Sequence, residues 1–224
     1  MMMTTRYMMI GMVITMGCST LAWCAEAKVM RVACVGDSLT SGFKMENPAQ
    51  EAYPAQLGKL LGETYDVQGF AVPGHTALRG TERPLWVKPE FQAAQDFKPD
   101  IVVIILGSND SWPTIWAERK GDFEKDLTDL VNVFAELPSK PKCILGLPLP
   151  FFIDDEHQKK IMRDEVNVGI QNVAKALSIP VIDMYTPFLD RPELVMTDKV
   201  HPLPSGAKEM AELVAEAIGC VERK

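Results

Sequence analysis

The sequence predicts a single α/β domain, built as a three-layer α/β/α sandwich around a five-stranded parallel sheet. Short, continuously apolar runs alternate along the chain with segments whose apolar residues recur at helical spacing. Residues 101–106 are apolar at every position, which is typical of a central parallel strand covered on both faces. The length of 224 residues suits one well-buried domain and is short for two.

Each predicted element is an apolar run of strand length or a helical repeat, and glycine or proline marks several of the ends. Gly36 ends the first strand and Gly62 the first helix, while Pro99 and Pro138 end the next two helices. In chain order we predict a strand at 29–35, a helix at 53–62, a strand at 65–72, a helix at 89–97, a strand at 101–106, a helix at 122–137, a strand at 143–147, a helix at 158–177, a strand at 180–184 and a helix at 205–218.

The strand order predicted for this sheet is the flavodoxin-like 2-1-3-4-5, which places the first three strands side by side. Their carboxyl ends carry Ser38, Gly74 and Asn109, respectively. Ligands of open α/β sheets bind in the crevice beyond these strand ends. We therefore expect the three turns to converge on one site.

The first 25 residues differ from the rest and are predicted to be a secretory signal peptide. Arg6 precedes the uncharged segment 7–25, which has an apolar centre followed by small residues. An uncleaved membrane anchor is the alternative. We expect an exported protein, periplasmic or extracellular, with its domain over 26–224 and membrane contact only through an uncleaved N-terminal segment.

Composition narrows the possible ligands. The net charge is -7 and no basic patch is visible, which argues against nucleic acid as a partner. The three histidines lie far apart and lack paired Cys or His spacing, so neither a metal nor a cofactor is expected. Beyond the predicted signal peptide only Cys34, Cys143 and Cys220 remain, which is no disulfide framework, and the first two are expected to be small buried apolar residues.

The turns contain a candidate for each role in nucleophilic catalysis by serine. Ser38 is the candidate nucleophile, His201 its base, and Asp198 the group that holds the tautomer of His201. The Ser38 and Gly74 backbone N–H groups and the Asn109 side-chain amide are candidate oxyanion donors. Each turn taken alone has a structural alternative: Asp198 and His201 suit the turn before a helix, and Asn109 an Asx turn after a strand.

Four stretches, 36–39, the Gly74 turn, 107–110 and 198–201, resemble the four sequence blocks of the SGNH/GDSL hydrolase superfamily, in order and at suitable separations. The resemblance covers essentially the whole exported chain and implies a Ser38-His201-Asp198 triad with an oxyanion hole at Ser38, Gly74 and Asn109. One departure is residues 69–74, which read Gly-Phe-Ala-Val-Pro-Gly where relatives often read Asn-x-Gly-x-x-Gly.

Finer features resemble bacterial sialate O-acetylesterase and other carbohydrate acetylesterases. These are the helix that starts at Tyr53-Pro54, the segment 86–88, the 107–110 block followed by Trp112, and the stretch 147–150. The expected activity is therefore that of a carboxylic ester hydrolase, an acetylesterase that removes O-acetyl groups from a glycan or small-molecule ester through an acyl-enzyme. The alternatives are a lipase, arylesterase or thioesterase for longer acyl chains, and a silent glycan-binding domain.

Candidate substrate-binding residues lie beside the catalytic turns. Trp86, Trp112 and Trp116 have flat faces that suit sugar rings, although packing in the protein is an equal alternative for each. His75 directly follows Gly74, and a solvated loop histidine is its alternative. The substrate-binding residues predicted are Asp37, His75, Trp86 and Trp112.

Overall fold

The computed structural model describes residues 28–222 of the chain. The signal peptide predicted over residues 1–25 lies outside the described residues. Among the helices of residues 28–222, none is long and apolar enough to cross a membrane.

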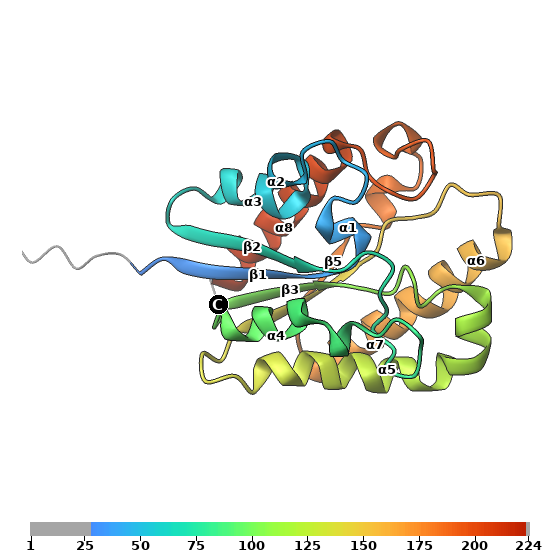
Figure 1. Cartoon of the computed structure of the whole chain (residues 1–224), viewed down its shortest axis with the longest axis horizontal. Helices are drawn as coiled ribbons and strands as arrows, with labels where there is room; N and C mark the ends of the chain where they lie inside the picture. Colours follow the sequence, from blue (N-terminus) through green and yellow to red (C-terminus); the bar gives the residue numbers. More distant parts are fainter. Residues whose placement is uncertain (1–27, 223–224) are drawn as a thin grey trace, which may run out of the picture.

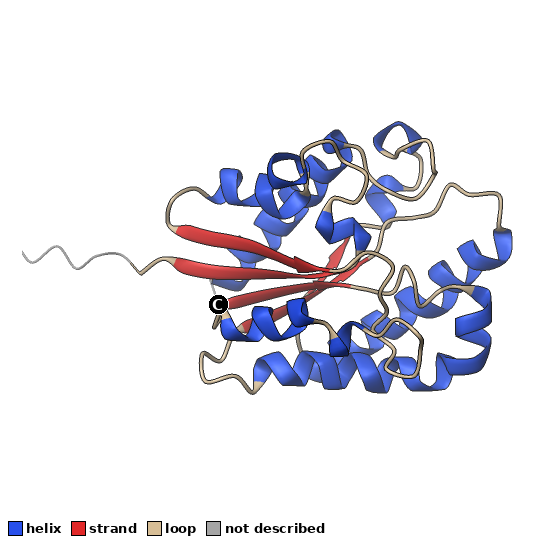
Figure 2. Cartoon of the chain, in the orientation of Figure 1, coloured by secondary structure: helices blue, strands red, loops and turns tan. Residues whose placement is uncertain are grey.

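The centre of the fold is a parallel sheet (Figure 2). Its strand order is β2-β1-β3-β4-β5, which confirms the prediction. The register places Val32 opposite Ile101 and Gly36 opposite Ile105, so the first and third strands end level with each other. The strands are β1 (Met30–Gly36), β2 (Tyr65–Ala71), β3 (Ile101–Ile105), β4 (Lys142–Leu147) and β5 (Val181–Asp183).

Helices cover both faces of the sheet, as the sandwich prediction requires (Figure 1). Helices α3 and α8 cover one face, and α4, α5 and α7 the other. The helices are α1 (Ser38–Ser41), α2 (Pro48–Glu51), α3 (Tyr53–Leu61), α4 (Pro89–Asp96), α5 (Pro113–Ala135), α6 (Glu156–Ile161), α7 (Asn167–Leu177) and α8 (Pro204–Glu222), with a π-helical segment η2 (Met162–Val166) and short 3-10 turns η1 (Leu85–Val87), η3 (Thr186–Phe188) and η4 (Pro192–Leu194).

The continuous apolar runs are explained by two separate cores, one on each face of the sheet. In β1, Val32 and Cys34 pack toward α3 and α8, while Ala33 and Val35 pack toward the opposite helices. All four side chains are fully buried. Because successive strand residues point to opposite faces, a strand buried on both sides must be apolar at every position.

The cysteines of the two cores behave as small apolar residues, as predicted. Burial raises the pKa of Cys34 to about 12, against a smaller opposing effect of a hydrogen bond from Tyr53, and burial raises the pKa of Cys143 to about 11. The two residues belong to cores on opposite faces of the sheet. Neither thiol therefore has the lowered pKa of a reactive cysteine.

Two of the predicted helices differ most from the structure, while the short helices α1 and α2 were not predicted and α8 extends four residues beyond its predicted end. α5 begins at Pro113, nine residues before the predicted start at Asp122, because Pro113 occupies its first turn and Trp116 is buried against Phe123. The charged residues that follow Trp116 obscure this first part in the apolar pattern. The helix predicted over 158–177 is instead α6, the π-helical η2 and α7, since a π segment shifts the face that later residues present.

Candidate active site

Ser38 lies at the carboxyl end of β1, as the first residue of the short helix α1. The side chain of Asp37 caps this helix by accepting a 3.0 Å hydrogen bond from the Leu39 N–H. Only glycine fits at position 36, because a Cβ there would lie 2.2 Å from the Thr40 hydroxyl and 2.7 Å from the Ile105 carbonyl oxygen. The tight turn thereby places Ser38 just beyond the carboxyl end of β1.

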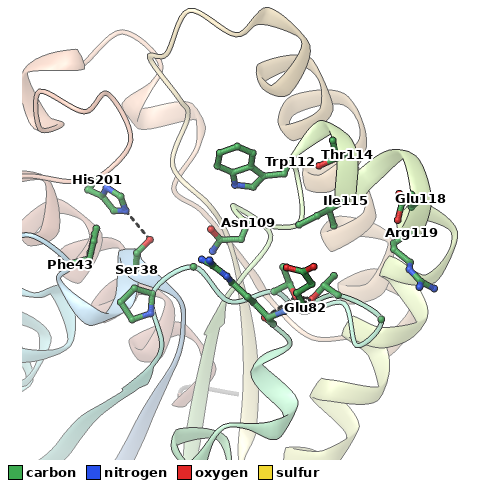
Figure 3. Close-up of a pocket in the computed structure, with 16 residues that line it drawn as sticks. Ser38, Phe43, Glu82, Asn109, Trp112, Thr114, Ile115, Glu118, Arg119 and His201 are labelled. Carbon is green, nitrogen blue, oxygen red and sulfur yellow. Dashed lines mark hydrogen bonds between the residues drawn. The ribbon is translucent and has the colours of Figure 1, made fainter.

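The structure brings Ser38, His201 and Asp198 into one chain of hydrogen bonds, of which Figure 3 shows the contact between Ser38 and His201. His201 Nε2 lies 2.9 Å from Ser38 Oγ, and His201 Nδ1 lies 2.8 Å from Asp198 Oδ2. The other oxygen, Asp198 Oδ1, accepts from the backbone N–H groups of Val200 and His201 at 3.1 and 3.0 Å. Asp198 therefore closes the turn before α8 and contacts the imidazole at the same time.

Two residues that follow α1, Phe43 and Lys44, contact the hydrogen-bonded residues Asp198 and His201 from the solvent side. The Lys44 ammonium lies 2.7 Å from Asp198 Oδ2, and the Phe43 ring lies 5.0 Å from the His201 ring, centroid to centroid. Partial burial raises the pKa of Asp198, but hydrogen bonds from Lys44, from His201 and from the Val200 N–H together hold it well below its usual range. Asp198 is therefore an anion at any pH near neutrality.

Two of the three predicted oxyanion donors are available in the structure. Ser38, Gly74 and Asn109 all line one pocket. Gly74 has a φ of 77°, a conformation that favours glycine. Among the hydrogen bonds of residues 28–222, none uses the backbone N–H of Ser38 or Gly74.

The side-chain amide of Asn109, the third predicted donor, is already occupied, because both of its hydrogens are donated to other groups of the protein. They go to Asp37 Oδ2 and to the His75 carbonyl oxygen, each at 3.0 Å. For Asn109 to stabilise an oxyanion, one of these two bonds must be given up or shared. Asp37 therefore acts on Asn109 and not on a ligand.

Asp37 and His75, predicted to bind substrate, lie behind the pocket wall and do not line it. Asp37 is fully buried, and His75 is 8% exposed with Nδ1 2.9 Å from the Pro73 carbonyl oxygen. Burial raises the pKa of Asp37 to about 7, because it outweighs the hydrogen bond from the Leu39 N–H and is assisted by the charge of Asp110. The structure therefore places both predicted residues outside the lining of the pocket, where each accepts a hydrogen bond from Asn109.

The raised pKa of Asp37 leads to a prediction about stability. Its pKa in the unfolded chain is near 3.8, so the folded protein retains this proton up to about pH 7. The bound proton stabilises the folded protein fully at a pH below the pKa of Asp37 in the unfolded chain. This stabilisation is lost as the pH rises through the pKa of Asp37 in the folded protein. In Asp37→Asn we therefore expect a smaller loss of unfolding free energy between about pH 4 and about pH 7 than in the unsubstituted protein, measured by urea denaturation.

Asp129→Asn is the control for this experiment. A hydrogen bond from Lys125 lowers the pKa of Asp129, so this exposed carboxylate stays ionised throughout the same interval. Its stability curve should run parallel to that of the unsubstituted protein. Parallel curves for Asp37→Asn as well would show that Asp37 ionises normally.

The pocket has a volume of about 870 Å³. It is lined by segments that follow β1, β2 and β3, by the first turns of α5, and by His201. The expected convergence of the three turns is thus observed. The 80–83 loop and α5 supply its charged side chains, which are Glu82, Arg83, Glu118 and Arg119.

The three tryptophans are not equivalent in the structure. Trp112 lines the pocket and is 55% exposed, with its ring visible above Asn109 and Ile115 in Figure 3. Trp86 does not line the pocket: its Nε1 donates to the Ala77 carbonyl oxygen and its ring packs 5.3 Å from that of Phe91. The structure therefore places Trp86, predicted to bind substrate, in packing contacts outside the pocket lining.

Trp116 also belongs to the packed interior. It is 5% exposed, and its Nε1 donates to Glu165 at 2.7 Å. Phe43 and Arg83 also line the pocket and are not among the residues predicted from the sequence. For Phe43 a signal existed, an aromatic residue five positions after the candidate nucleophile. No local signal separates Arg83 from other loop arginines.

Comparison with known proteins agrees with this geometry. The family model described as the GDSL-like lipase/acylhydrolase family matches residues 34–208, which include Ser38, Gly74, Asn109 and the 198–201 turn. The chain belongs to this family. Its membership confirms the predicted superfamily and the enzyme class of carboxylic ester hydrolases.

One curated relative of the chain is named as a carbohydrate esterase. The chain is 35% identical over 207 residues to an acetylxylan esterase of Xylanibacter ruminicola, an alignment that covers 84% of this chain and 43% of that protein. The chain thus spans less than half the length of this curated relative.

Solved structures show the same fold. One is a carbohydrate acetylesterase from Sinorhizobium meliloti, at 16% identity and a TM-score of 0.64, with 86% of this chain and 99% of that chain covered. Another is a catalytic mutant of an acetylxylan esterase from Geobacillus stearothermophilus, at 20% identity and a TM-score of 0.64, with 87% and 96% covered. Both confirm the α/β/α sandwich.

Proposed function

We propose that this chain is an exported serine esterase that removes O-acetyl groups from carbohydrates. The main support for the proposal is the series of hydrogen bonds that joins Ser38, His201 and Asp198. Ser38 and His201 line a pocket together with Gly74, and the backbone N–H groups of Ser38 and Gly74 have no partner in the described residues. The relative of 35% identity, an acetylxylan esterase, supports the acetyl and carbohydrate parts. The uncharged segment 7–25 supports export, which a mass measurement of the mature protein from its host would test.

In the first half of the proposed reaction, Ser38 Oγ attacks the carbonyl carbon of the acetyl ester while its proton passes to His201 Nε2. Asp198 accepts from His201 Nδ1 and stabilises the imidazolium that forms. Ser38 and Gly74 line the pocket, and their unpartnered N–H groups are the proposed donors to the carbonyl oxygen as negative charge develops on it. The intermediate collapses, the C–O bond to the sugar breaks, and His201 returns the proton to the sugar oxygen.

In the second half, a water molecule takes the place of the sugar. His201 accepts a proton from this water as it attacks the acetyl-Ser38 ester. The second tetrahedral intermediate releases acetic acid, and the proton on His201 returns to Ser38 Oγ. The net reaction consumes one ester and one water, releases one alcohol and one acetic acid, and needs no other reactant.

The pocket wall favours a short acyl group and a polar partner over a long alkyl chain. Glu82, Arg83, Glu118 and Arg119 line it, and Trp112 offers the exposed aromatic face. An alkyl chain placed against these groups would take their charges out of water without replacing the lost hydrogen bonds. A sugar, with hydroxyl groups at its edge and an apolar face, satisfies both kinds of surface.

We therefore expect kcat/KM to fall as the acyl chain lengthens. Between acetyl and octanoyl p-nitrophenyl esters the fall should be at least roughly tenfold, since a misfit acyl chain costs 1.4 kcal/mol or more. Acetate release from acetylated xylan, measured in parallel, tests the carbohydrate part. A preference for octanoyl would instead favour a lipase, and binding of acetylated sugars without any hydrolysis would favour the silent binding domain.

A further inference from the structure

Arg83 places a positive charge at the catalytic end of the pocket. It lines the pocket together with Ser38 and Asn109. Its Nη1 lies only 3.3 Å from the position that a Cβ at Gly74 would occupy, so the guanidinium lies directly beside this glycine of the pocket lining. The other pocket arginine, Arg119, lies at the far end, well away from Ser38 (Figure 3).

Hydrogen bonds fix the backbone that carries Arg83. Its carbonyl oxygen accepts from the Thr76 N–H at 2.9 Å and from the Thr76 hydroxyl at 3.1 Å, and its N–H donates to the Thr81 hydroxyl. The start of the same loop is held by the fully buried Asp110, which accepts from the N–H groups of Ala77 and Leu78. The side chain therefore extends from a backbone that is already ordered.

Arg83 also differs from the other described arginines in its partners. No carboxylate within residues 28–222 forms an ion pair with it, not even its neighbour Glu82. Every other described arginine has such a partner, in the pairs Arg31–Asp100, Arg79–Asp129, Arg119–Asp122, Arg163–Asp164 and Arg191–Glu193. A guanidinium that has no partner and faces a pocket is suited to a planar anion, which it can bind through two parallel hydrogen bonds.

We propose that Arg83 binds a carboxylate of the sugar, so that the preferred substrates are acetyl esters of acidic glycans that contain uronic acid units. The inference rests on the proposed function, because an acetyl group is uncharged and the anion must then belong to the sugar. Arg83 is a specificity-determining residue in this proposal and takes no part in the transfer of protons.

Two substrates that differ only in charge test the proposal. They are the O-acetylated methyl glycoside of galacturonic acid and its carboxamide, and the measured quantity is the ratio of their kcat/KM values. For the unsubstituted protein we expect the acid to be favoured by roughly tenfold or more, the effect of one charge-assisted hydrogen bond. In Arg83→Gln the ratio should fall to near one, and Arg83→Lys should restore part of it.

Arg31→Gln is the matched control, because it removes the same charge from the start of β1, at the opposite end of the strand from Ser38. Its ratio should equal that of the unsubstituted protein, and thermal melting should show that each variant is folded. Equal loss on both substrates in Arg83→Gln would assign Arg83 to the oxyanion and overturn the proposal. A ratio near one in the unsubstituted protein would also overturn it.

Failure of the proposed function gives a different result, namely no acetate from either substrate. Calorimetric binding of the deacetylated galacturonide and its carboxamide to the unsubstituted protein and to Arg83→Gln then decides the subsite. Binding of the acid that is weakened by Arg83→Gln, with no such change for the carboxamide, supports the carboxylate subsite. Equal binding of the acid to both proteins overturns it.

Discussion

Replacing Ser38 with alanine is expected to lower kcat/KM for acetyl esters by roughly 10,000-fold or more, without a change in the fold. The hydroxyl removed is the group that His201 Nε2 contacts at 2.9 Å, and no acyl-enzyme can form without it. Ser38 is almost buried, and alanine leaves the helix cap made by Asp37 in place. Stopped-time assays of acetate release measure the loss, and thermal melting monitors the fold.

Ser41→Ala is the control, since Ser41 lies in the same short helix and donates to the Ser38 carbonyl oxygen at 3.3 Å. It should keep most of the activity. A serine-directed organophosphate should add once to Ser38 in the unsubstituted protein and in Ser41→Ala, and not in Ser38→Ala, as read by mass spectrometry. An adduct on another residue, or activity of Ser38→Ala within tenfold of the original, would exclude Ser38 as the nucleophile.

Asp198→Asn is expected to be nearly as damaging, with kcat lowered by roughly 10,000-fold. The backbone N–H groups of Val200 and His201 donate to Oδ1, so they require an oxygen at that position. The new amide nitrogen must then occupy the position of Oδ2, where it donates to His201 Nδ1. This bond selects the tautomer whose Nε2 carries the proton, and that tautomer cannot accept the proton of Ser38.

The ion pair between Lys44 and Asp198 provides the control for this variant. Lys44→Met removes the ammonium that lies 2.7 Å from Oδ2 but leaves the contact between Asp198 and His201 intact. Because the Lys44 side chain is half exposed, we expect a loss of less than about tenfold. If Lys44→Met lost as much activity as Asp198→Asn, the ion pair and not the tautomer would explain the effect of Asp198.

The fold was accessible from local patterns. The runs that became β1, β3 and β4 are apolar at successive positions because two cores, on opposite faces, share these strands. Charged surface residues hide the periodicity where a helix has little apolar contact, which is why the first nine residues of α5 escaped prediction. The π-helical segment η2 leaves no comparable mark in the sequence.

Only part of the candidate site could be predicted from the sequence. Ser38, Gly74 and the 198–201 turn stand next to strand ends or helix starts, where glycine, serine and aspartate have specific backbone roles that can be recognised. Asn109 was placed correctly in the pocket, but the sequence contains no sign that Asp37 and His75 take both of its amide hydrogens. Those bonds join residues that are 72 and 34 positions apart.

By itself, therefore, the sequence determined the α/β/α sandwich, its strand order and the turns that meet at the carboxyl edge of the sheet, because apolar continuity and turn chemistry are local properties. Which side chains line the pocket depends instead on long-range contacts: Trp112 and Arg83 line it, and Trp86 and His75 do not. The direction of a loop side chain depends on contacts with distant residues, such as the hydrogen bonds from the 76–83 loop to Asp110. No local pattern encodes those contacts.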